Sequence, residues 1–249
     1  MSTAVRQLRD AYDPFALIYN RDIAETFCRR VWPVVERLLL SRMARHSRIL
    51  DLCCGSGQMA RELTKRGYPV TGLDGSEAML RIARHNAPRA DFALADAREF
   101  AFVMPFDAVL SIFNSFAHAS TATELESMLR NARAALSQGG AMLFDLSMEE
   151  QYITKWRGSF GEVHEDVAWI VRASFDQKKR RALNDITLFQ RDSSSQWQRE
   201  DFAFQQHCYL ESEIRDVLTR VGFAHIESFD AARDLGIEKE SGRRFFLCS

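Results

Sequence analysis

The amino-acid sequence predicts an α/β fold, with a doubly wound sheet covered by helices and a later antiparallel insertion. Two observations predict it. Between residues 48 and 146, short apolar runs alternate with helical stretches, as in successive βαβ units of a parallel sheet. After about residue 156, strand-like runs follow one another without helices between them. The 249 residues suffice for one large domain, and 46% hydrophobic with 27% charged residues is typical of a globular protein.

The first segment, residues 8–40, is expected to be helical. Its apolar residues recur at spacings near three and four, which places them on one face of a helix. We expect Pro33 to end or kink this segment, because proline lacks the amide donor that a helix interior needs.

The second segment contains the parallel sheet. Ser76 is expected to cap a helix with its hydroxyl. The Gly139–Gly140 pair is expected to turn the chain into the fifth strand. The expected strands are residues 49–53, 70–73, 91–94, 106–112 and 141–146, and the expected helices are residues 58–66, 76–86 and about 121–137.

The third segment is expected to be the antiparallel insertion followed by the end of the main sheet. Turn-forming residues separate its strands, at residues 176–179 and 192–195. The expected strands of the insertion are residues 167–171, 182–189 and 202–209, followed by a helix at 211–221 and two further runs at 224–229 and 244–248.

Composition narrows the function classes. A net charge of −1 gives no electrostatic footprint for nucleic acid or an anionic membrane. We interpret the basic run at residues 178–181 as a solvated hairpin turn. Five irregularly spaced cysteines and the absence of a secretory h-region favour reduced thiols and a cytoplasmic location. Cysteine and histidine spacing gives no metal framework, so no metal is expected.

The strongest motif is the loop at residues 51–57, Asp-Leu-Cys-Cys-Gly-Ser-Gly, between the first strand and the next helix. Gly55 and Gly57 allow a tight turn and a close approach of the backbone to a ligand. Residues 55–60 also fit the dinucleotide pattern G-x-G-x-x-G/A. The glycines alone therefore leave a nicotinamide or flavin cofactor as an alternative.

Acidic residues follow three successive strands: Asp51, Asp74 and Asp96. A pyrophosphate on the loop would be repelled by an aspartate beside it. A cationic adenosyl ligand suits all three, because Asp51 can face its ammonium, Asp74 its ribose hydroxyls and Asp96 its adenine amine. The same acids can serve as helix caps and turn residues. Met79 can pack on adenine or belong to the core.

Residues 49–146 resemble the class I S-adenosylmethionine-dependent methyltransferases. The resemblance rests on the loop at 51–57, on Gly-Leu-Asp-Gly-Ser-Glu-Ala-Met-Leu at 72–80, on Ala-Asp-Ala at 95–97 and on Gly139–Gly140. It implies a mostly parallel seven-stranded sheet whose last strand, at 244–248, is antiparallel. It also implies S-adenosylmethionine as cofactor.

The resemblance is to small-molecule members of that family, such as amino-sugar and amine N-methyltransferases. Residues 12–19 resemble their N-terminal helical lid, whose tyrosines cover the cofactor; alternatively, these aromatic residues only pack the helix onto the sheet. The residues expected to bind the cofactor are Tyr12, Tyr19, Asp51, Cys53, Gly55, Gly57, Asp74, Gly75, Met79, Asp96, Ala97 and Phe113.

His118 is the candidate general base. It follows the fourth strand, beside the expected methyl end of the cofactor, and a free histidine titrates near neutrality. It can instead cap the following helix or only line the pocket. The insertion is expected to roof the acceptor site, with Trp169 favoured as core. Its candidate lining residues are Trp156, Trp169, Trp197, His207 and Tyr209.

The leading hypothesis is a methyltransferase acting on the N or O of a small-molecule acceptor. The alternatives are an NAD(P)-dependent oxidoreductase of the Rossmann type and a non-enzymatic cofactor-sensing module. A single domain is expected, as a monomer or homodimer. Its parts are a lid (1–45), a cofactor-binding core (46–150), a substrate roof (151–209) and the end of the core sheet (210–249).

Overall fold

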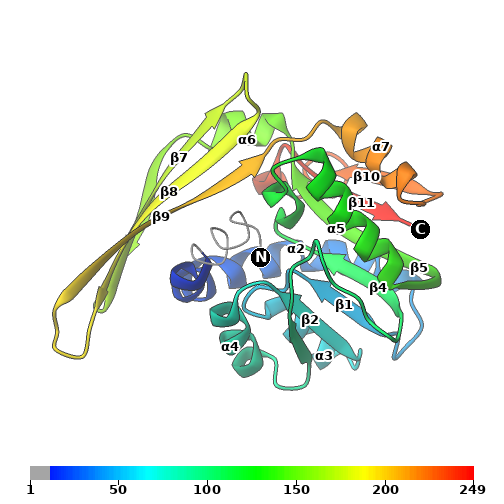
Figure 1. The fold of residues 1–249 in the computed structure, drawn as a ribbon, viewed down its shortest axis with the longest axis horizontal. Coiled ribbons are helices and arrows are strands. Elements are labelled where there is room, and N and C mark those ends of the chain that lie inside the picture. The colour runs from blue at the N-terminus through cyan, green and yellow to red at the C-terminus, as the bar shows by residue number, and fades with distance from the viewer. Residues whose placement is uncertain (1–11) are drawn as a thin grey trace.

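The computed structural model describes residues 12–249 (Figure 1). Its main sheet has seven strands in the order β10-β11-β5-β4-β1-β2-β3. Within it, β11 runs antiparallel to both β5 and β10, and the other neighbouring pairs are parallel. This confirms the predicted sheet with its antiparallel last strand. The strands are β1 (Ile49–Leu52), β2 (Val70–Asp74), β3 (Asp91–Leu94), β4 (Phe106–Ser111), β5 (Leu136–Ser147), β10 (Ile226–Asp230) and β11 (Arg243–Cys248).

Hydrophobic cores lie on both faces of this sheet. Helices α5 and α7 pack on one face and α2 and α3 on the other. Neighbouring residues of β4 alternate between them: Val109 belongs to the first core, and Ala108 and Leu110 to the second. Burial on both faces explains the continuous apolar runs in the sequence. The helices are α2 (Glu25–Leu38), α3 (Gln58–Lys65), α4 (Glu77–Asn86), α5 (Ala122–Ala135), α6 (Glu149–Lys155) and α7 (Glu211–Arg220).

The N-terminal segment is helical, as the sequence predicted. Residues 12–18 are helical and lead through a π-helical turn, η1 (Tyr19–Ala24), into α2; the expected beginning at residue 8 lies outside the described residues. Of the two expected effects of Pro33, an end or a kink, the structure contradicts the first, because α2 runs through Pro33 to Leu38. A proline costs a helix interior about 3 kcal/mol. Burial of the later apolar residues, at about 1.5–3 kcal/mol each, outweighs that cost.

Other element boundaries differ in detail. Ser76 caps α4 as expected, with its hydroxyl accepting from the amide of Met79. The strand β5 begins at Leu136 rather than 141, because Leu136 already pairs with Phe106. The Gly139–Gly140 pair therefore lies inside the strand, opposite a shift in register, instead of preceding it.

A second sheet, here called the roof, has the antiparallel order β6-β7-β8-β9 and forms a long twisted ribbon beside the main sheet (Figure 1). The sequence missed β6, because this strand is exposed along its whole length and lacks an apolar alternation. The roof strands are β6 (Gly158–Val163), β7 (Val167–Asp176), β8 (Arg181–Arg191) and β9 (Trp197–His207).

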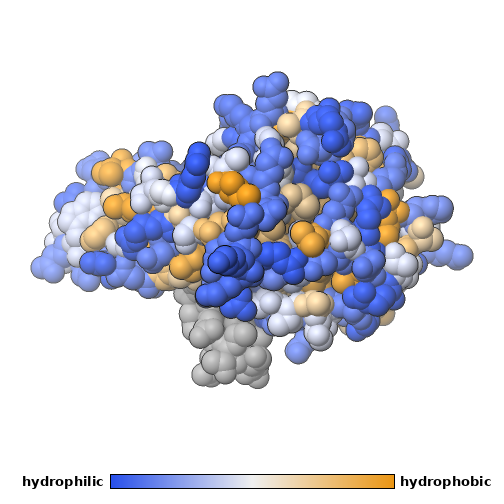
Figure 2. All heavy atoms as spheres, turned by 90° about the horizontal axis from the view of Figure 1, so that it is seen from above, coloured by the Kyte–Doolittle hydropathy of each residue, from blue (hydrophilic) through white to orange (hydrophobic). Residues whose placement is uncertain are grey.

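The N-terminal helix joins the roof to the core. Phe15 and Ile18 pack with Trp169 and Phe204 on the inner face of the roof, and Met79 of α4 belongs to the same cluster. Along residues 12–249, no helix is both long and apolar enough to cross a membrane. On the face seen in Figure 2, hydrophobic residues form small patches among polar ones.

Candidate active site

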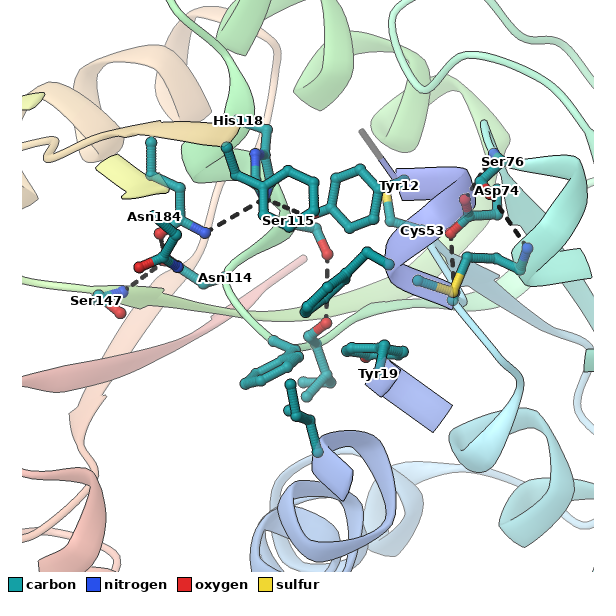
Figure 3. A pocket seen from close by; sticks show the side chains of 18 of the residues that line it. Tyr12, Tyr19, Cys53, Asp74, Ser76, Asn114, Ser115, His118, Ser147 and Asn184 are labelled. Atoms are coloured by element: carbon teal, nitrogen blue, oxygen red, sulfur yellow. Dashed lines mark hydrogen bonds between the residues drawn. The ribbon is translucent and has the colours of Figure 1, made fainter. Parts of the chain in front are cut away.

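A cavity of about 490 Å³ lies beyond the carboxyl ends of β1, β2 and β4, between the main sheet and the roof. In Figure 3, Cys53 and Asp74 lie at one end, Asn114 and Asn184 at the other, and Tyr12 between them. Most of the expected cofactor-binding residues come together here. Those that line the cavity are Tyr12, Tyr19, Cys53, Gly55, Asp74, Gly75, Met79, Asp96, Ala97 and Phe113.

The loop after β1 turns through left-handed backbone at Cys53, Gly55 and Gly57, with φ of +59°, +52° and +83°. A Cβ on Gly55 would lie 2.9 Å from Cε1 of Tyr19, so only glycine fits there beside that ring. Gly57 does not line the cavity. It starts α3, and a Cβ there would lie 3.0 Å from Ala83. Gly55 thus shapes the cavity, whereas Gly57 shapes the turn into the helix.

Asp74, at the end of β2, holds the glycine loop in place. Its carboxylate accepts hydrogen bonds from the amide of Gly55 at 2.8 Å and from the amide of Ser76 at 2.9 Å. Burial raises the pKa of Asp74, and these amide donors oppose the rise. The turn interpretation of this residue is confirmed, because the carboxylate fixes the turn, and the carboxylate also lines the cavity.

Asp51 is buried beside the main cavity, where it lines a smaller adjoining one together with Tyr19 and Cys53. Its Oδ2 atom has no hydrogen-bond partner among the described residues. Burial, reinforced by the nearby charge of Asp74, raises the pKa of Asp51 to about 7. A buried carboxylate oxygen without a partner is costly, and a cationic ligand group would relieve that cost.

Asp96 forms an ion pair with Arg98, a residue that the sequence analysis did not single out. Arg98 donates to Asp96 from Nε at 2.9 Å and from Nη2 at 2.8 Å, and its Nη1 donates to Glu124 at 3.0 Å. The arginine follows Asp96 by two residues, but only the fold turns its side chain back on the carboxylate. Met79 is buried in the core and also lines the cavity.

The loop after β4 carries two consecutive residues with left-handed backbone, Phe113 at φ +79° and Asn114 at φ +63°. Non-glycine residues adopt this conformation at a cost and tend to do so at functional sites. Oδ1 of Asp145 accepts from both of their amides, at 2.6 and 3.3 Å. This carboxylate from β5 therefore stabilises the strained loop.

Asp145 is itself paired with Arg243, and both side chains are almost fully buried. Arg243 also donates to Glu240 at 3.0 Å, and its guanidinium lies over the ring of Phe27, 4.9 Å from the centroid. Burial raises the pKa of Asp145, and the charge of Arg243 opposes that rise. Arg243 and Glu240 both line the cavity.

His118 lies in the cavity lining and contacts the N-terminal helix through Tyr12. Its Nε2 is 2.6 Å from the hydroxyl of Tyr12, and its Nδ1 is 3.2 Å from the carbonyl of Gln205. Burial lowers the pKa of His118 to about 4. A free histidine titrates near neutrality, and burial accounts for the difference. Burial also raises the pKa of the Tyr12 hydroxyl.

The roof contributes fewer of the expected aromatic residues than the sequence suggested. Trp156 lines the cavity, and Trp169 is buried in the core, as favoured. Trp197 is 48% exposed and Tyr209 is buried in the main core, and neither lines the cavity. His207 is also absent from the lining. The alternating register of a strand decides which side chains face inward, and the sequence pattern did not specify that register.

The sequence analysis did not identify three uncharged polar residues that line the cavity on the side away from Asp74, here called the acceptor end. They are Asn114, Asn184 and Gln206. Uncharged amides carry no motif, so no local signal could have found them. Among residues 12–249, no group of three or more His, Cys, Asp and Glu is placed to hold a metal ion.

The residues that lie at the carboxyl ends of β1 and β2 fit S-adenosylmethionine. The unpartnered oxygen of Asp51 suits an ammonium, the carboxylate of Asp74 suits ribose hydroxyls, and Gly55 leaves room that a Cβ would take. Carboxylates lie beside the loop at 51–57, Asp51 within it and Asp74 bonded to its Gly55 amide, where they would repel a pyrophosphate.

Comparison with known proteins agrees with this site. Residues 49–140 match the methyltransferase domain family. A dTDP-3-amino-3,4,6-trideoxy-alpha-D-glucopyranose N,N-dimethyltransferase of Streptomyces venezuelae is 32% identical over 136 residues, which are 55% of each chain.

Two solved structures share the fold over nearly the whole chain. An S-adenosylmethionine-dependent methyltransferase from Clostridium acetobutylicum superposes with a TM-score of 0.78 at 20% identity, covering 96% of this chain and 98% of that one. CalS10, an amino pentose methyltransferase from Micromonospora echinaspora bound to S-adenosylmethionine, gives a TM-score of 0.71 at 21% identity, covering 93% and 95%.

The sheet order, the glycine loop with its acids and the match over residues 49–140 define a class I S-adenosylmethionine-dependent methyltransferase. Within that class, the chain is similar to the amino-sugar N-methyltransferases. The oxidoreductase and the non-enzymatic sensing module are therefore not retained.

Proposed function

We propose that this enzyme methylates the nitrogen of a small-molecule amine. The observation that carries the proposal is the Tyr12–His118 pair in the cavity, next to the strained loop at Phe113. The similarity to the N,N-dimethyltransferase of Streptomyces venezuelae and to the amino pentose methyltransferase CalS10 supports an acceptor that resembles an amino sugar. Bound S-adenosylmethionine would supply an electrophilic methyl group on a sulfonium centre.

The residues at the sheet end would hold the cofactor by charge and shape. Asp51 would bind the ammonium, Asp74 the ribose, and Asp96 with Ala97 the adenine. Cys53, Gly55 and Gly75 would line the part of the cofactor site that lies between these three aspartates. Tyr19, on the N-terminal helix, would cover that part of the site. The reaction then needs an acceptor held in line with the transferred methyl group, which is a matter of positioning and exclusion of water.

The low pKa of His118 favours nitrogen over oxygen as the acceptor atom. A hydroxyl must lose its proton to become a good nucleophile, and a histidine with a pKa of about 4 is a weak base for that purpose. A neutral amine attacks with its lone pair, and the positive charge passes from sulfonium to ammonium without an obligatory proton transfer. His118 would then act by binding Tyr12 and orienting the acceptor, rather than as a strong general base.

The walls of the acceptor end suit a small polar ring. The inner face of the roof provides apolar contacts from Val171, Ile186 and Phe204, and Asn184 projects among them without a hydrogen-bond partner in the described part of the chain. A cavity of about 490 Å³ lies within the usual range for small-molecule sites. The net charge of −1 supports a small molecule rather than nucleic acid.

A pair of acceptors that differ at one atom tests the proposal. S-adenosylhomocysteine release would be measured with amino sugars and with the same sugars carrying a hydroxyl in place of the amine. We expect turnover with members of the amine set and at least about 100-fold lower kcat/KM with their hydroxyl partners. Turnover of the hydroxyl set alone would overturn the assignment to nitrogen.

A further inference from the structure

A backbone amide of the main sheet sets the direction of a hydrogen-bond chain that reaches His118. The amide of Ser147 in β5 donates to Oδ1 of Asn114 at 2.8 Å. A backbone N–H is always a donor, so the oxygen of this Asn114 side chain must be the atom facing it. The Nδ2 atom of Asn114 therefore faces the roof (Figure 3).

The next link crosses from the main sheet to the roof. Nδ2 of Asn114 donates to Oε1 of Gln206 at 2.6 Å and to the hydroxyl of Tyr152 at 3.1 Å. The Tyr152 hydroxyl in turn donates to Oε1 of Gln206 at 3.1 Å. With its oxygen held by two donors, Gln206 must present its Nε2 amide group on the other side.

That amide group meets His118. Nε2 of Gln206 lies 3.3 Å from Nε2 of His118, and because the amide can only donate, the histidine nitrogen must accept. The other ring nitrogen, Nδ1, faces the carbonyl of Gln205, which can only accept, so Nδ1 carries the proton. Two consecutive residues of β9 thus specify the same tautomer from opposite sides of the ring.

The consequence falls on Tyr12. Its hydroxyl lies 2.6 Å from the accepting Nε2 of His118, so its single proton is directed to the histidine. The phenolic oxygen then has only lone pairs to offer elsewhere, and Tyr12 lines the cavity. Stacking of the Tyr12 ring on Phe204, with centroids 4.4 Å apart, keeps the ring in this orientation.

We propose that Gln206 is a positioning residue that holds His118 in its Nδ1–H form, so that Tyr12 can only accept a hydrogen bond from the methyl acceptor. This rests on the proposed function and names its substrate class: primary and secondary amines, which keep an N–H for Tyr12 while the lone pair attacks. A tertiary amine has no N–H, so methylation stops at the dimethylated product. A carboxylate has none either and is repelled by the phenolic lone pairs.

The surroundings of His118 support a neutral ring. Burial lowers its pKa to about 4, and the Gln205 carbonyl opposes this only in part. Tyr12 is the titratable side chain in direct contact with it in the described chain, and burial and the charge of Asp74 raise the pKa of that phenol. Both partners therefore stay uncharged at neutral pH.

The tautomer is measurable directly in the whole wild-type protein. Long-range ¹H–¹⁵N spectra of ¹⁵N-histidine-labelled protein, assigned with His118→Asn, distinguish a protonated Nδ1 from a protonated Nε2. We expect Nδ1–H and an unprotonated Nε2 from pH 6 to pH 8, about two or more units above the pKa. A protonated Nε2 over this range would overturn the proposal, whatever the acceptor proves to be.

Gln206→Glu tests the positioning role with little change in shape. One carboxylate oxygen still accepts from Asn114 and Tyr152, while the other replaces the amide donor that faces His118. The carboxylate should raise the pKa of His118 by about 1–3, as opposite charges at contact do. Gln205→Glu is the control, because it adds the same charge one residue away on the exposed outer face. A similar rise in both variants, or in neither, contradicts the positioning role.

Turnover completes the test. In Gln206→Glu, a protonated His118 would donate to the Tyr12 oxygen, so the ratio of variant to wild-type kcat/KM for an amine should fall about tenfold between pH 8 and pH 5. A ratio independent of pH would indicate a merely structural role. Mass spectra of wild-type products should show no quaternary ammonium, and finding one would overturn the N–H requirement. If no amine turns over, the proposed function fails, while the tautomer measurement still decides the hydrogen-bond chain.

Discussion

The ring of Tyr19 lies directly against Gly55, close enough that a Cβ on the glycine would stand 2.9 Å from the ring atom Cε1. This contact joins the lid helix to the loop that follows β1. The lid and the glycine loop are therefore one surface of the cavity, and a change in either should be felt as a change in cofactor binding.

Gly55→Ala is expected to weaken S-adenosylmethionine binding by at least about tenfold, since its methyl group would displace Tyr19 or the loop. Isothermal titration measures this. Gly67→Ala is the matched control, because Gly67 is also left-handed, at φ +88°, but a Cβ there meets nothing within 4 Å. The control should lose some stability and keep its affinity. Equal losses of affinity in both variants would refute the steric explanation.

Binding of the cofactor should strengthen as pH rises toward neutrality. Asp51 has a pKa of about 7 in the free protein, so it is mostly protonated at pH 6 and mostly ionised at pH 8. A cationic ligand binds the ionised form. Below pH 7, affinity should therefore fall by up to about tenfold per pH unit, with proton release on binding. Titrations in two buffers of different ionisation enthalpy measure both effects.

Asp51→Asn should make the affinity nearly independent of pH in this range, and a slope equal to that of the wild type would exclude Asp51 as its source. The same residue affects stability. Its folded pKa lies above the unfolded value, so it binds more protons in the folded state, and its contribution is lost as pH rises toward 7. The variant should therefore gain Tm over the wild type more at pH 8 than at pH 4.

Arg243→Met should destabilise the fold strongly. It leaves the carboxylate of Asp145 buried without its cation, a change that typically costs about 3–5 kcal/mol. It should also lower kcat/KM, because Asp145 holds the strained amides of Phe113 and Asn114. Urea unfolding and initial rates give the two readouts. Arg233→Met is the control, since it breaks a solvent-exposed pair with Asp234, and such pairs contribute little to stability. Similar losses in both variants would argue against the buried network.

Tyr12→Phe removes one hydroxyl and keeps the stack on Phe204. We expect kcat/KM for the amine to fall by about 10–100-fold, because the acceptor loses its orienting contact, while affinity for S-adenosylmethionine changes little. Steady-state rates and cofactor titration check this. A loss confined to cofactor affinity would place Tyr12 on the cofactor rather than the acceptor.

Much of the fold was predictable because local patterns and long-range packing agree. Residues 91–94 read as a strand and form β3 with the same bounds, and Ser76 has the hydroxyl that an N-cap requires. Pro33 does not end α2, because burial of the apolar residues beyond it outweighs the local cost of proline. The roof strand β6 failed because its pairing with β7, rather than any apolar pattern, makes it a strand.

The site divides in the same way. The sequence by itself indicated the proposed cofactor-binding end, because Asp51, Gly55 and Asp74 lie at or just after the ends of strands that a parallel sheet brings to one edge. Only the tertiary structure decided the acceptor end, where Asn114 of the main sheet meets Gln206 of the roof, 92 residues later. The physical reason is that hydrogen-bond direction and burial depend on neighbours distant in the chain. Burial also keeps the His118 ring uncharged at neutral pH, whereas the residue type alone suggests a base that titrates near neutrality.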